Sequence, residues 1–302
     1  MHYLVTGGAG FIGTNIVKKL LEGGHTVRVL DNYSAGKKEE RFQNGAEYIE
    51  GDIRNMADVG GAMKGMDGVF HEAAVPRVPY SVEHPAETTE HNILGTVRVL
   101  EAARDAKVKR VVFASSSSIY GSEEKVALTE DMPKRPKSPY ALQKLTGGEY
   151  CRLFSELYGL QTVALVYFNI YGPYMDPEGA YALVIGKFLK QKQDGKPLTI
   201  CGDGEYYRDY THVDDCVRAN LLAMQSDAVG KGELINIGNN DPHSVNEVAR
   251  LIGGPTTNVP PRLGDTRYSQ ADNKKAKELL GWEPTIRLEE GIERLKREWN
   301  IE

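Results

Sequence analysis

Short apolar runs alternate with longer amphipathic segments through the first half of the chain. The short runs are bounded by turn residues, as buried strands are, and the longer segments repeat apolar side chains at helical spacing. We predict strands at residues 3–6, 26–30, 47–50, 69–71, 110–114 and 162–167, and helices at residues 11–21, 88–106 and 140–157. Such alternation implies right-handed crossovers and therefore an α/β fold with a doubly wound parallel sheet.

The alternation weakens after about residue 169. Turn-rich segments at 171–177 and 202–206 precede a last helical pattern at 288–299, which predicts a smaller C-terminal α/β lobe. Because the segment around 207–237 could return to the first domain, we expect a discontinuous organisation. The two parts are residues 1–168 with about 207–237, and residues 169–206 with 238–302.

Composition and charge narrow the class of protein. The 302 residues, 40% of them hydrophobic, can bury a sizeable core, and the net charge of −5 without a long basic run argues against nucleic acid as a partner. Cys151, Cys201 and Cys216 show no CxxC pairing, which suggests neither a disulfide framework nor a metal site. The first apolar run leads directly into a glycine-rich turn, and no apolar stretch reaches the roughly 20 residues of a membrane span. We therefore expect a cytoplasmic protein that does not bind a membrane.

A glycine-rich loop lies between the first predicted strand and the first predicted helix. Gly7, Gly10 and Gly13 have the spacing GxxGxxG, which differs from the GxGxxG of simple dehydrogenases. Gly7 permits a tight turn, Gly10 lets the backbone approach a pyrophosphate, and Gly13 lets the helix pack closely on the strand. The helix N-terminus offers N–H groups to the anion. A purely structural turn is the alternative, but this context favours a Rossmann-type dinucleotide site.

Asp31 ends the second predicted strand, about 20 residues after the loop, where a carboxylate can accept hydrogen bonds from ribose hydroxyls. A carboxylate there repels a 2′-phosphate, so NAD is preferred to NADP. Asp52 and Ile53 follow the third strand and could border the adenine, although an ordinary strand-end Asp is nearly as good an interpretation. Three nearby cations could serve a phosphate, but we expect a solvated loop: Lys37, Lys38 and Arg41.

Tyr140 and Lys144 stand four residues apart just after Pro139, and helical spacing places both side chains on one face. A phenol is a poor base at neutral pH, but a nearby ammonium and a positive nicotinamide ring favour the phenolate. Tyr140 could then take a hydroxyl proton. Four serines, residues 115–118, leave the end of the fifth predicted strand, and one of them should hydrogen-bond both the substrate and Tyr140, while the others could satisfy the turn itself.

These residues resemble the extended short-chain dehydrogenase/reductase family, and within it the UDP-hexose 4-epimerases. The motifs occur in family order along the whole chain. They are TGGAGFIG at 6–13, HEAA at 71–74, SSSSIYG at 115–121, SPYALQK at 138–144, YFNIYGP at 167–173, RDYTHVDD at 208–215 and RLGD at 262–265.

The resemblance implies a role for each matching residue. Ser116, Tyr140 and Lys144 form the implied catalytic group. The implied NAD site comprises Gly7, Gly10, Phe11, Ile12, Gly13, Asp31, Asn32, Asp52, Ile53, Ala73 and Ala74, together with Tyr140 and Lys144. The implied substrate site comprises Arg77, Ser116, Ser117, Ser118, Tyr140, Asn169, Arg208, Arg262, Asp265 and Ser269. Arginine suits a diphosphate because its guanidinium is a planar fork.

The implied reaction is C4 epimerisation of a UDP-sugar. Tyr140 removes the C4 hydroxyl proton while the C4 hydride passes to NAD, and the 4-keto sugar takes the hydride back on its opposite face. The resemblance also implies a homodimer in which helices 88–106 and 140–157 form a four-helix bundle. Dehydratases of the family carry Asp-Glu where this chain has Ser117 and Ser118, and decarboxylases usually place an acid in the same turn. A reductase and a non-catalytic NAD-binding protein are further alternatives.

Two positions bear on the sugar. Arg77 could pair with the carboxylate of a uronic acid, or it could face solvent or the cofactor phosphates. Ser269 is small at a position whose bulk limits the sugar pocket in the family, which suggests room for an N-acetyl group. Val166 stands where the related motif often has Arg, and we have no functional interpretation of this change.

Overall fold

A seven-stranded parallel sheet forms the centre of the protein in the computed structural model, which describes residues 1–121, 125–178, 183–261 and 267–301. The strands, in their order across the sheet, are β11 (Lys231–Ile237), β6 (Gln161–Tyr167), β5 (Arg110–Ser116), β4 (Gly68–His71), β1 (His2–Thr6), β2 (Thr26–Asp31) and β3 (Glu47–Glu50). The chain moves outward from β1 in both directions. This order confirms the predicted doubly wound fold.

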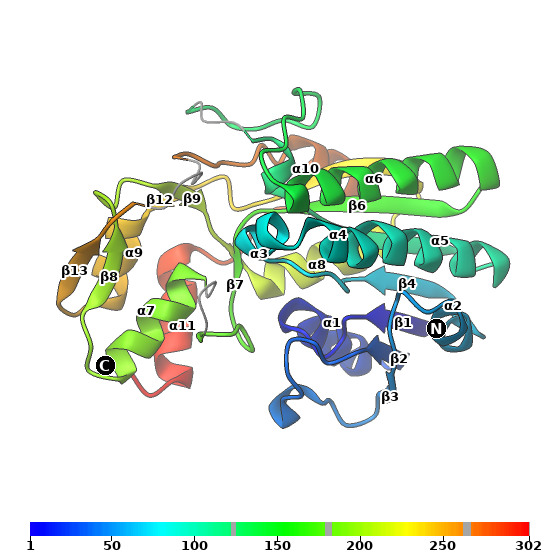
Figure 1. The fold of residues 1–302 in the computed structure, drawn as a ribbon, viewed down its shortest axis with the longest axis horizontal. Helices are drawn as coiled ribbons and strands as arrows, with labels where there is room; N and C mark the ends of the chain where they lie inside the picture. Colours follow the sequence, from blue (N-terminus) through cyan, green and yellow to red (C-terminus); the bar gives the residue numbers. More distant parts are fainter. Residues whose placement is uncertain (122–124, 179–182, 262–266, 302) are drawn as a thin grey trace.

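Helices cover both faces of the sheet, and α5 and α6 lie side by side (Figure 1). One face carries α2 (Met56–Met63), α5 (Thr96–Asp105) and α6 (Pro139–Tyr158), and the other carries α1 (Phe11–Glu22), α8 (Val213–Gln225) and α10 (Lys274–Leu280). Successive strand residues therefore enter two different cores: Leu4 packs with the α5 side and Val5 with the α1 side. Burial on both faces explains why the strands are continuous apolar runs.

The predicted helix at 88–106 is wrong in one respect, because it is not a single α-helix. The chain passes from α3 (Val78–Glu83) through α4 (Pro85–Thr89) into a π-helical segment, η2 (Glu90–Gly95), before α5 begins. The widened turn carries Asn92, which bonds both backbone groups of Val75 in the loop after β4. Such bulges often lie at functional sites.

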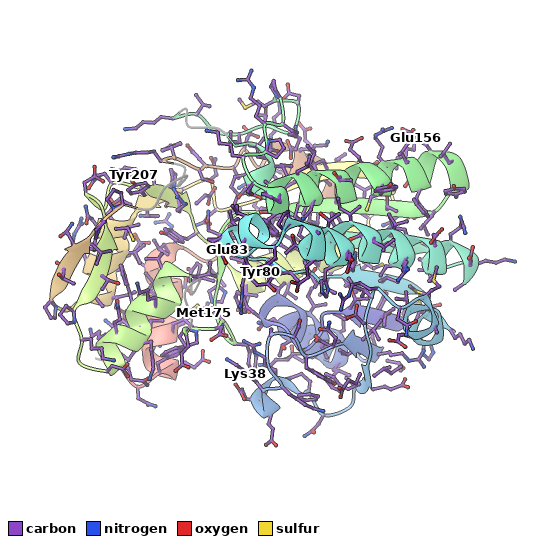
Figure 2. The ribbon with its side chains drawn as sticks, viewed as in Figure 1. Lys38, Tyr80, Glu83, Glu156, Met175 and Tyr207 are labelled. Carbon is purple, nitrogen blue, oxygen red and sulfur yellow. The ribbon has the colours of Figure 1, made fainter. Side chains whose placement is uncertain are left out.

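A smaller assembly with its own apolar core lies beside the sheet (Figure 1). It consists of α7 (Val184–Gln193), α9 (Val245–Ile252) and α11 (Leu288–Glu298), with β8 (Leu198–Cys201) pairing β13 (Thr256–Val259). Two further strand pairs connect the assemblies: β7 (Ile170–Tyr171) with β10 (Thr211–His212), and β9 (Tyr207–Asp209) with β12 (Pro242–Ser244). Tyr207 marks this region in Figure 2.

Short 3₁₀ turns complete the secondary structure, namely η1 (Glu39–Arg41) and η3 (Ser117–Ile119). Among the helices of the described residues, none combines the length and the apolar character needed to cross a lipid bilayer.

Candidate active site

The glycine-rich loop crosses the carboxyl end of β1 and makes contacts that only glycine permits. A Cβ atom on Gly7 would lie 2.7 Å from the amide nitrogen of Ala73, and one on Gly13 would lie 2.2 Å from the carbonyl oxygen of Gly7. Gly7 also has a φ of 72°. Gly10 is the N-cap of α1 and brings no side chain to the first amides, those of Phe11 and Ile12. The loop therefore fits the pyrophosphate of a dinucleotide.

Gly13→Ala should destabilise the protein by about 2 kcal/mol, because its Cβ meets backbone atoms that must shift. The variant should also retain less NAD after purification. Thermal unfolding and the NAD released by acid measure the two effects. Gly61→Ala is the matched control: it lies in α2 with open space around the added Cβ, and helix propensity should stabilise it by less than about 1 kcal/mol. Equal stability and NAD content in the two variants would contradict the assignment.

Asp31 lies at the end of β2, beside the glycine-rich loop. Its two carboxylate oxygens accept hydrogen bonds from the amides of Ala9, at 3.0 Å, and Tyr33, at 2.8 Å. Burial raises the pKa of Asp31, and these two amides act in the opposite direction. The glycine-rich loop and the Asp31 carboxylate are thus held together by bonds within the protein.

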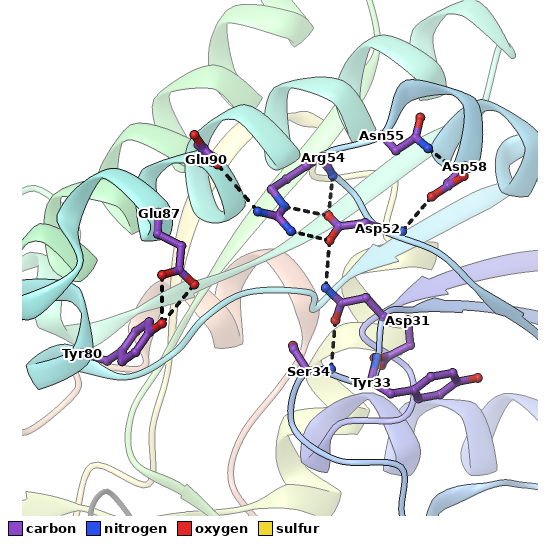
Figure 3. A network of polar contacts seen from close by, with 11 residues as sticks. Asp31, Tyr33, Ser34, Asp52, Arg54, Asn55, Asp58, Tyr80, Glu87 and Glu90 are labelled. Carbon is purple, nitrogen blue, oxygen red and sulfur yellow. Dashed lines mark hydrogen bonds and ion pairs between the residues drawn. The ribbon is translucent and has the colours of Figure 1, made fainter.

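Asp52 and Arg54 are central to the polar network in Figure 3. Arg54 donates to both oxygens of Asp52, at 3.1 and 2.9 Å, and its Nη1 lies 3.6 Å from Glu90 on η2. Asn32 donates to Asp52 at 3.0 Å. The Arg54 guanidinium holds the pKa of the Asp52 carboxyl well below its usual range. Ile53 is buried, so its side chain belongs to the core. The network joins the ends of β2 and β3 to η2.

Arg41 departs from the expected solvated loop. Its side chain is 3% exposed, and it donates to the carbonyl oxygens of Tyr174, at 2.6 Å, and Ala9, at 3.5 Å. Lys38, labelled in Figure 2, lies 3.4 Å from Asp176. The expectation is wrong for Arg41 because the segment after β7 packs onto this turn, which the local sequence does not reveal. Arg41 ties that segment to the glycine-rich loop.

The helix that carries Tyr140 and Lys144 begins after Ser138, whose hydroxyl accepts a hydrogen bond from the amide of Ala141. Tyr140 and Lys144 face the sheet, and both are buried. The Lys144 ammonium donates to the carbonyl oxygen of Ala114 at 2.7 Å. The hydroxyl of Ser116, which ends β5, lies near enough to the Tyr140 phenol to lower its pKa. The structure thus brings together the three residues predicted to react.

Burial opposes ionisation of both Tyr140 and Lys144. It raises the pKa of Tyr140 to about 12, although the hydrogen bond with Ser116 lowers it. Burial likewise lowers the pKa of Lys144, against which the carboxylate of Glu72 raises it. A phenolate at neutral pH therefore needs further positive charge, and the ring of an oxidised nicotinamide carries such a charge.

Three residues that sequence reasoning missed position the pair. Ser81 accepts a hydrogen bond from the amide of Tyr140 at 3.1 Å. Gln143, one residue before Lys144, accepts one at 2.8 Å from Asn92, whose side chain also accepts a bond from the amide of Val75. The available signal was a polar residue on an otherwise apolar helical face. Hydrophobic periodicity shows that such a residue is buried but does not identify its hydrogen-bond partner. These bonds fix α6 relative to η2 and the loop after β4, where Ala73 and Ala74 follow the strand.

Some of the polar groups in the serine turn, residues 115–118, hydrogen-bond one another. The amide and hydroxyl of Ser118 both donate to the Ser116 hydroxyl, at 3.3 and 3.0 Å. Ser115 points into the interior, where its hydroxyl finds no partner among the described residues. Ser117 is half-buried on η3. Ser116 is therefore the serine that meets Tyr140.

The residues expected to hold the nucleotide gather around β9. Asn169 has a φ of 38° and donates to the carbonyl oxygen of Asp209 at 3.1 Å. The Arg208 guanidinium donates to the carbonyl oxygen of Tyr207, which also accepts a bond from the amide of Ser269. Asn169, Arg208 and Ser269 are therefore all held by hydrogen bonds to backbone carbonyl oxygens of β9.

Arg77 lies elsewhere, exposed at the N-cap of α3. Arg262 and Asp265 fall outside the described residues. Val166 is completely buried in a core cluster on β6, which is a packing role.

A Rossmann-type sheet with a glycine-rich loop on β1 and a Ser, Tyr and Lys group at β5 and α6 defines a short-chain dehydrogenase/reductase. The chain belongs to the NAD dependent epimerase/dehydratase family, whose sequence model matches residues 3–238. This finding confirms the resemblance seen in the motifs.

Curated relatives and solved structures match nearly the whole chain. The UDP-glucose 4-epimerase of Mycolicibacterium smegmatis is 40% identical, covering 97% of this chain and 96% of the relative. The crystal structure of a Thermotoga maritima UDP-glucose 4-epimerase with UDP-glucose has a TM-score of 0.93 and 41% identity, covering 99% and 98%. A UDP-N-acetylglucosamine 4-epimerase from Methanobrevibacter ruminantium, in complex with UDP-N-acetylmuramic acid, has a TM-score of 0.93 and 34% identity, covering 99% and 97%.

Proposed function

We propose that this protein is an NAD-dependent 4-epimerase of UDP-hexoses. One observation carries the proposal: the buried Tyr140 meets Ser116 at the end of β5, while Ser117 and Ser118 occupy the turn where dehydratases carry acids. Elimination of water needs an acid and a base that this turn does not supply. The UDP-glucose 4-epimerases among the relatives and structures support the same activity.

The residues present fit NAD. The glycine-rich loop would hold the pyrophosphate, Asp31 and Asn32 the adenosine ribose, and the edge around Asp52 the adenine. When bound, NAD supplies a hydride acceptor for C4 of the sugar and a donor for its return. Ala73, Ala74 and Lys144 would border the nicotinamide half.

Side chains of the protein transfer the proton of the C4 hydroxyl and orient that hydroxyl. The Tyr140 phenolate receives the C4 hydroxyl proton and later returns it, so no net proton is consumed. Ser116 donates to the phenolate and orients the sugar hydroxyl, and the Lys144 ammonium stabilises negative charge on Tyr140. Burial of the pair keeps water away from the 4-keto sugar.

We propose that the nucleotide lies between the two parts of the chain. Residues 1–168 with about 207–237 would carry NAD, and residues 169–206 with 238–302 would hold the UDP. Asn169 and Arg208 are assigned to the diphosphate and Ser269 to the sugar pocket. Arg262 and Asp265 are assigned by their motif alone.

Incubation of the purified protein with UDP-glucose, UDP-N-acetylglucosamine and UDP-glucuronate in turn, without added reductant, tests the function. Chromatography and NMR should find a C4 epimer of at least one of them. Loss of bound NADH in step with product would instead identify a reductase, and a 4-keto deoxy product a dehydratase. An Arg77→Ala variant run beside the wild type tests the uronic acid assignment: selective loss with UDP-glucuronate supports it, and equal effects on all sugars contradict it.

We also propose a cytoplasmic homodimer built on α5 and α6. Leu142, Leu153 and Leu157 lie on one face of α6 and are exposed, and Leu94 is exposed on η2, which packs against α6. Apolar side chains gathered in this way mark an interaction surface. The three free cysteines fit a reducing compartment.

Replacing both Leu153 and Leu157 by Glu should turn the dimer into a monomer. Burying two carboxylates in the interface should weaken association at least about a hundredfold. Light scattering after gel filtration measures the mass. Met56→Glu, on the exposed side of α2, is the control and should leave the mass unchanged. A double variant that stays dimeric would place the interface elsewhere.

A further inference from the structure

Two buried side chains bridge the glycine-rich loop to the strap, the name used here for residues 173–176, which follow β7. We propose that Asn15 and Arg41 are positioning residues that hold the glycine-rich loop in its dinucleotide-binding shape through the strap and thereby slow the release of NAD. This inference goes beyond the proposed reaction. Of the proposed function it uses only the assignment of the loop to the NAD pyrophosphate.

Asn15 on α1 forms the first bridge. Its side-chain Nδ2 donates to the carbonyl oxygen of Phe11, at 3.0 Å, and to that of Pro173, also at 3.0 Å. Because both acceptors are carbonyl oxygens, the surroundings fix the orientation of the amide group. Asn15 is buried, so water competes little for these bonds. One side chain thus joins the first residue of α1, which directly follows the glycine-rich turn, to the first residue of the strap.

Arg41 on η1 forms the second bridge, to the next residue of the strap. Its Nη2 donates to the carbonyl oxygen of Tyr174 at 2.6 Å, and its Nη1 makes a longer bond of 3.5 Å to the carbonyl oxygen of Ala9. The amide of Ala9 donates to Asp31, so the backbone of this loop residue is held on both sides. The Arg41 Nε has no hydrogen-bond partner among the described residues. The bonds that this buried guanidinium makes therefore go to the loop and the strap.

The strap is anchored in the smaller assembly by an apolar side chain. Met175 is buried in the core of that assembly, at the place where the two assemblies meet (Figure 2). A Cβ atom on Gly186 of α7 would lie 3.3 Å from the Met175 sulfur and 3.4 Å from the Cα atom of Pro177, so the helix packs closely against this segment. Tyr174 has a φ of 67°, which a tyrosine rarely adopts and which surrounding contacts must maintain. Both bridges therefore end on a segment that the smaller core holds in place.

The bridges matter for NAD because the glycine-rich loop needs support from outside. Its glycines restrict the backbone little, so the loop by itself does not keep one shape. A loop already held in its bound shape binds its ligand more tightly, because less conformational freedom is lost on binding. Without the bridges the loop should open more often, and a bound dinucleotide can leave at each opening. We therefore expect faster release of NAD when either bridge is removed.

The test compares NAD release from the NAD-loaded wild type, Asn15→Leu and Arg41→Met. Both substitutions remove the bridging donors but keep a side chain of similar size, so packing is largely conserved. Alcohol dehydrogenase with excess ethanol converts each released NAD into NADH, whose absorbance is followed over time. Each variant should release NAD about tenfold faster than the wild type, as expected for the loss of one or two buried hydrogen bonds.

Arg28→Met is the matched control. Arg28 on β2 donates to the carbonyl oxygens of Ala62, at 3.0 Å, and Lys64, at 2.9 Å, at the end of α2. These bonds are of the same kind as those of Arg41 but join neither the loop nor the strap. The control should therefore release NAD within about twofold of the wild-type rate.

Hydrogen exchange followed by mass spectrometry gives a readout that needs neither bound NAD nor turnover. The amides of residues 6–13 and of the strap should exchange faster in Asn15→Leu and Arg41→Met than in the wild type. Those of β4 and β5 should stay as protected as before, because neither bridge contacts these strands. A general loss of stability would instead raise exchange throughout the sheet.

NAD release at the wild-type rate in either bridge variant would overturn the proposal, and so would equally fast release from Arg28→Met. Exchange that rises throughout the sheet would also contradict it. Retention of NAD by Gly13→Ala as tight as in the wild type would reject the assignment of the loop, and the proposal with it. Failure of the wild type to epimerise any UDP-sugar rejects the proposed reaction alone, since NAD release and hydrogen exchange are measured without substrate.

Discussion

Tyr140→Phe should lower kcat for C4 epimerisation by about a thousandfold, within the range expected for loss of a general acid and base. The substitution removes the one oxygen that can take the C4 hydroxyl proton while keeping the buried ring in place. Because phenylalanine keeps the buried ring and its packing, the fold should lose little stability. Product formation is followed by chromatography, and NAD content and the thermal midpoint are measured on the same sample.

Tyr171→Phe is a matched control for this prediction. It removes the same atom from another buried tyrosine, whose hydroxyl has no hydrogen-bond partner among the described residues. Its kcat should stay within about twofold of the wild type, since a surplus buried hydroxyl contributes nothing to the reaction. If Tyr140→Phe retained activity near that of Tyr171→Phe, another group would be the base, and the assignment of Ser116 and Lys144 around Tyr140 would fail with it.

Asp209→Ala should reduce the free energy of unfolding by about 4 kcal/mol. The buried Asp209 carboxylate accepts hydrogen bonds from three backbone amides, those of Asn239 at 2.6 Å, Asn240 at 3.0 Å and Ala271 at 2.8 Å. Without it, these amides are left buried and unpaired, and each such loss costs about 1–3 kcal/mol before the structure relaxes. Denaturant unfolding with spectroscopic detection measures the change.

Asp203→Ala separates this effect from the loss of an ordinary surface charge. Asp203 pairs with Arg267 at 2.9 Å, but both side chains are more than half exposed, so the loss should stay below about 1 kcal/mol. Comparable losses in the two variants would show that the Asp209 bonds do not hold the segments together. Because Asp209 adjoins Arg208, Asp209→Ala should also raise KM for the UDP-sugar in the molecules that remain folded.

Local features of the chain were enough to predict the sheet and the reacting pair. Tyr140 and Lys144 share a face because four residues make about one helical turn, and the strands were recognised because burial on both faces requires continuous apolar runs. The glycine spacing likewise reports a close approach of backbone to backbone, which Gly13 and Gly7 make. Each of these properties depends on a short stretch of sequence.

Bonds between distant segments could not be predicted in this way. Arg41 is buried because Tyr174, 133 residues further along, supplies its acceptor, and Glu72 is fixed by Tyr167, 95 residues away. The π-helical turn lies at Asn92, whose side chain accepts a hydrogen bond from the amide of Val75. No local pattern encodes which segments will pack together.

The sequence by itself thus determined the fold class, and it was enough to predict the dinucleotide loop and the residues that we propose handle the proton. Only the tertiary structure decided the electrostatic surroundings in which Tyr140 and Lys144 ionise. The physical reason is that secondary structure depends on nearby residues, whereas the pKa of a buried group depends on desolvation and on charges that the whole fold brings to it.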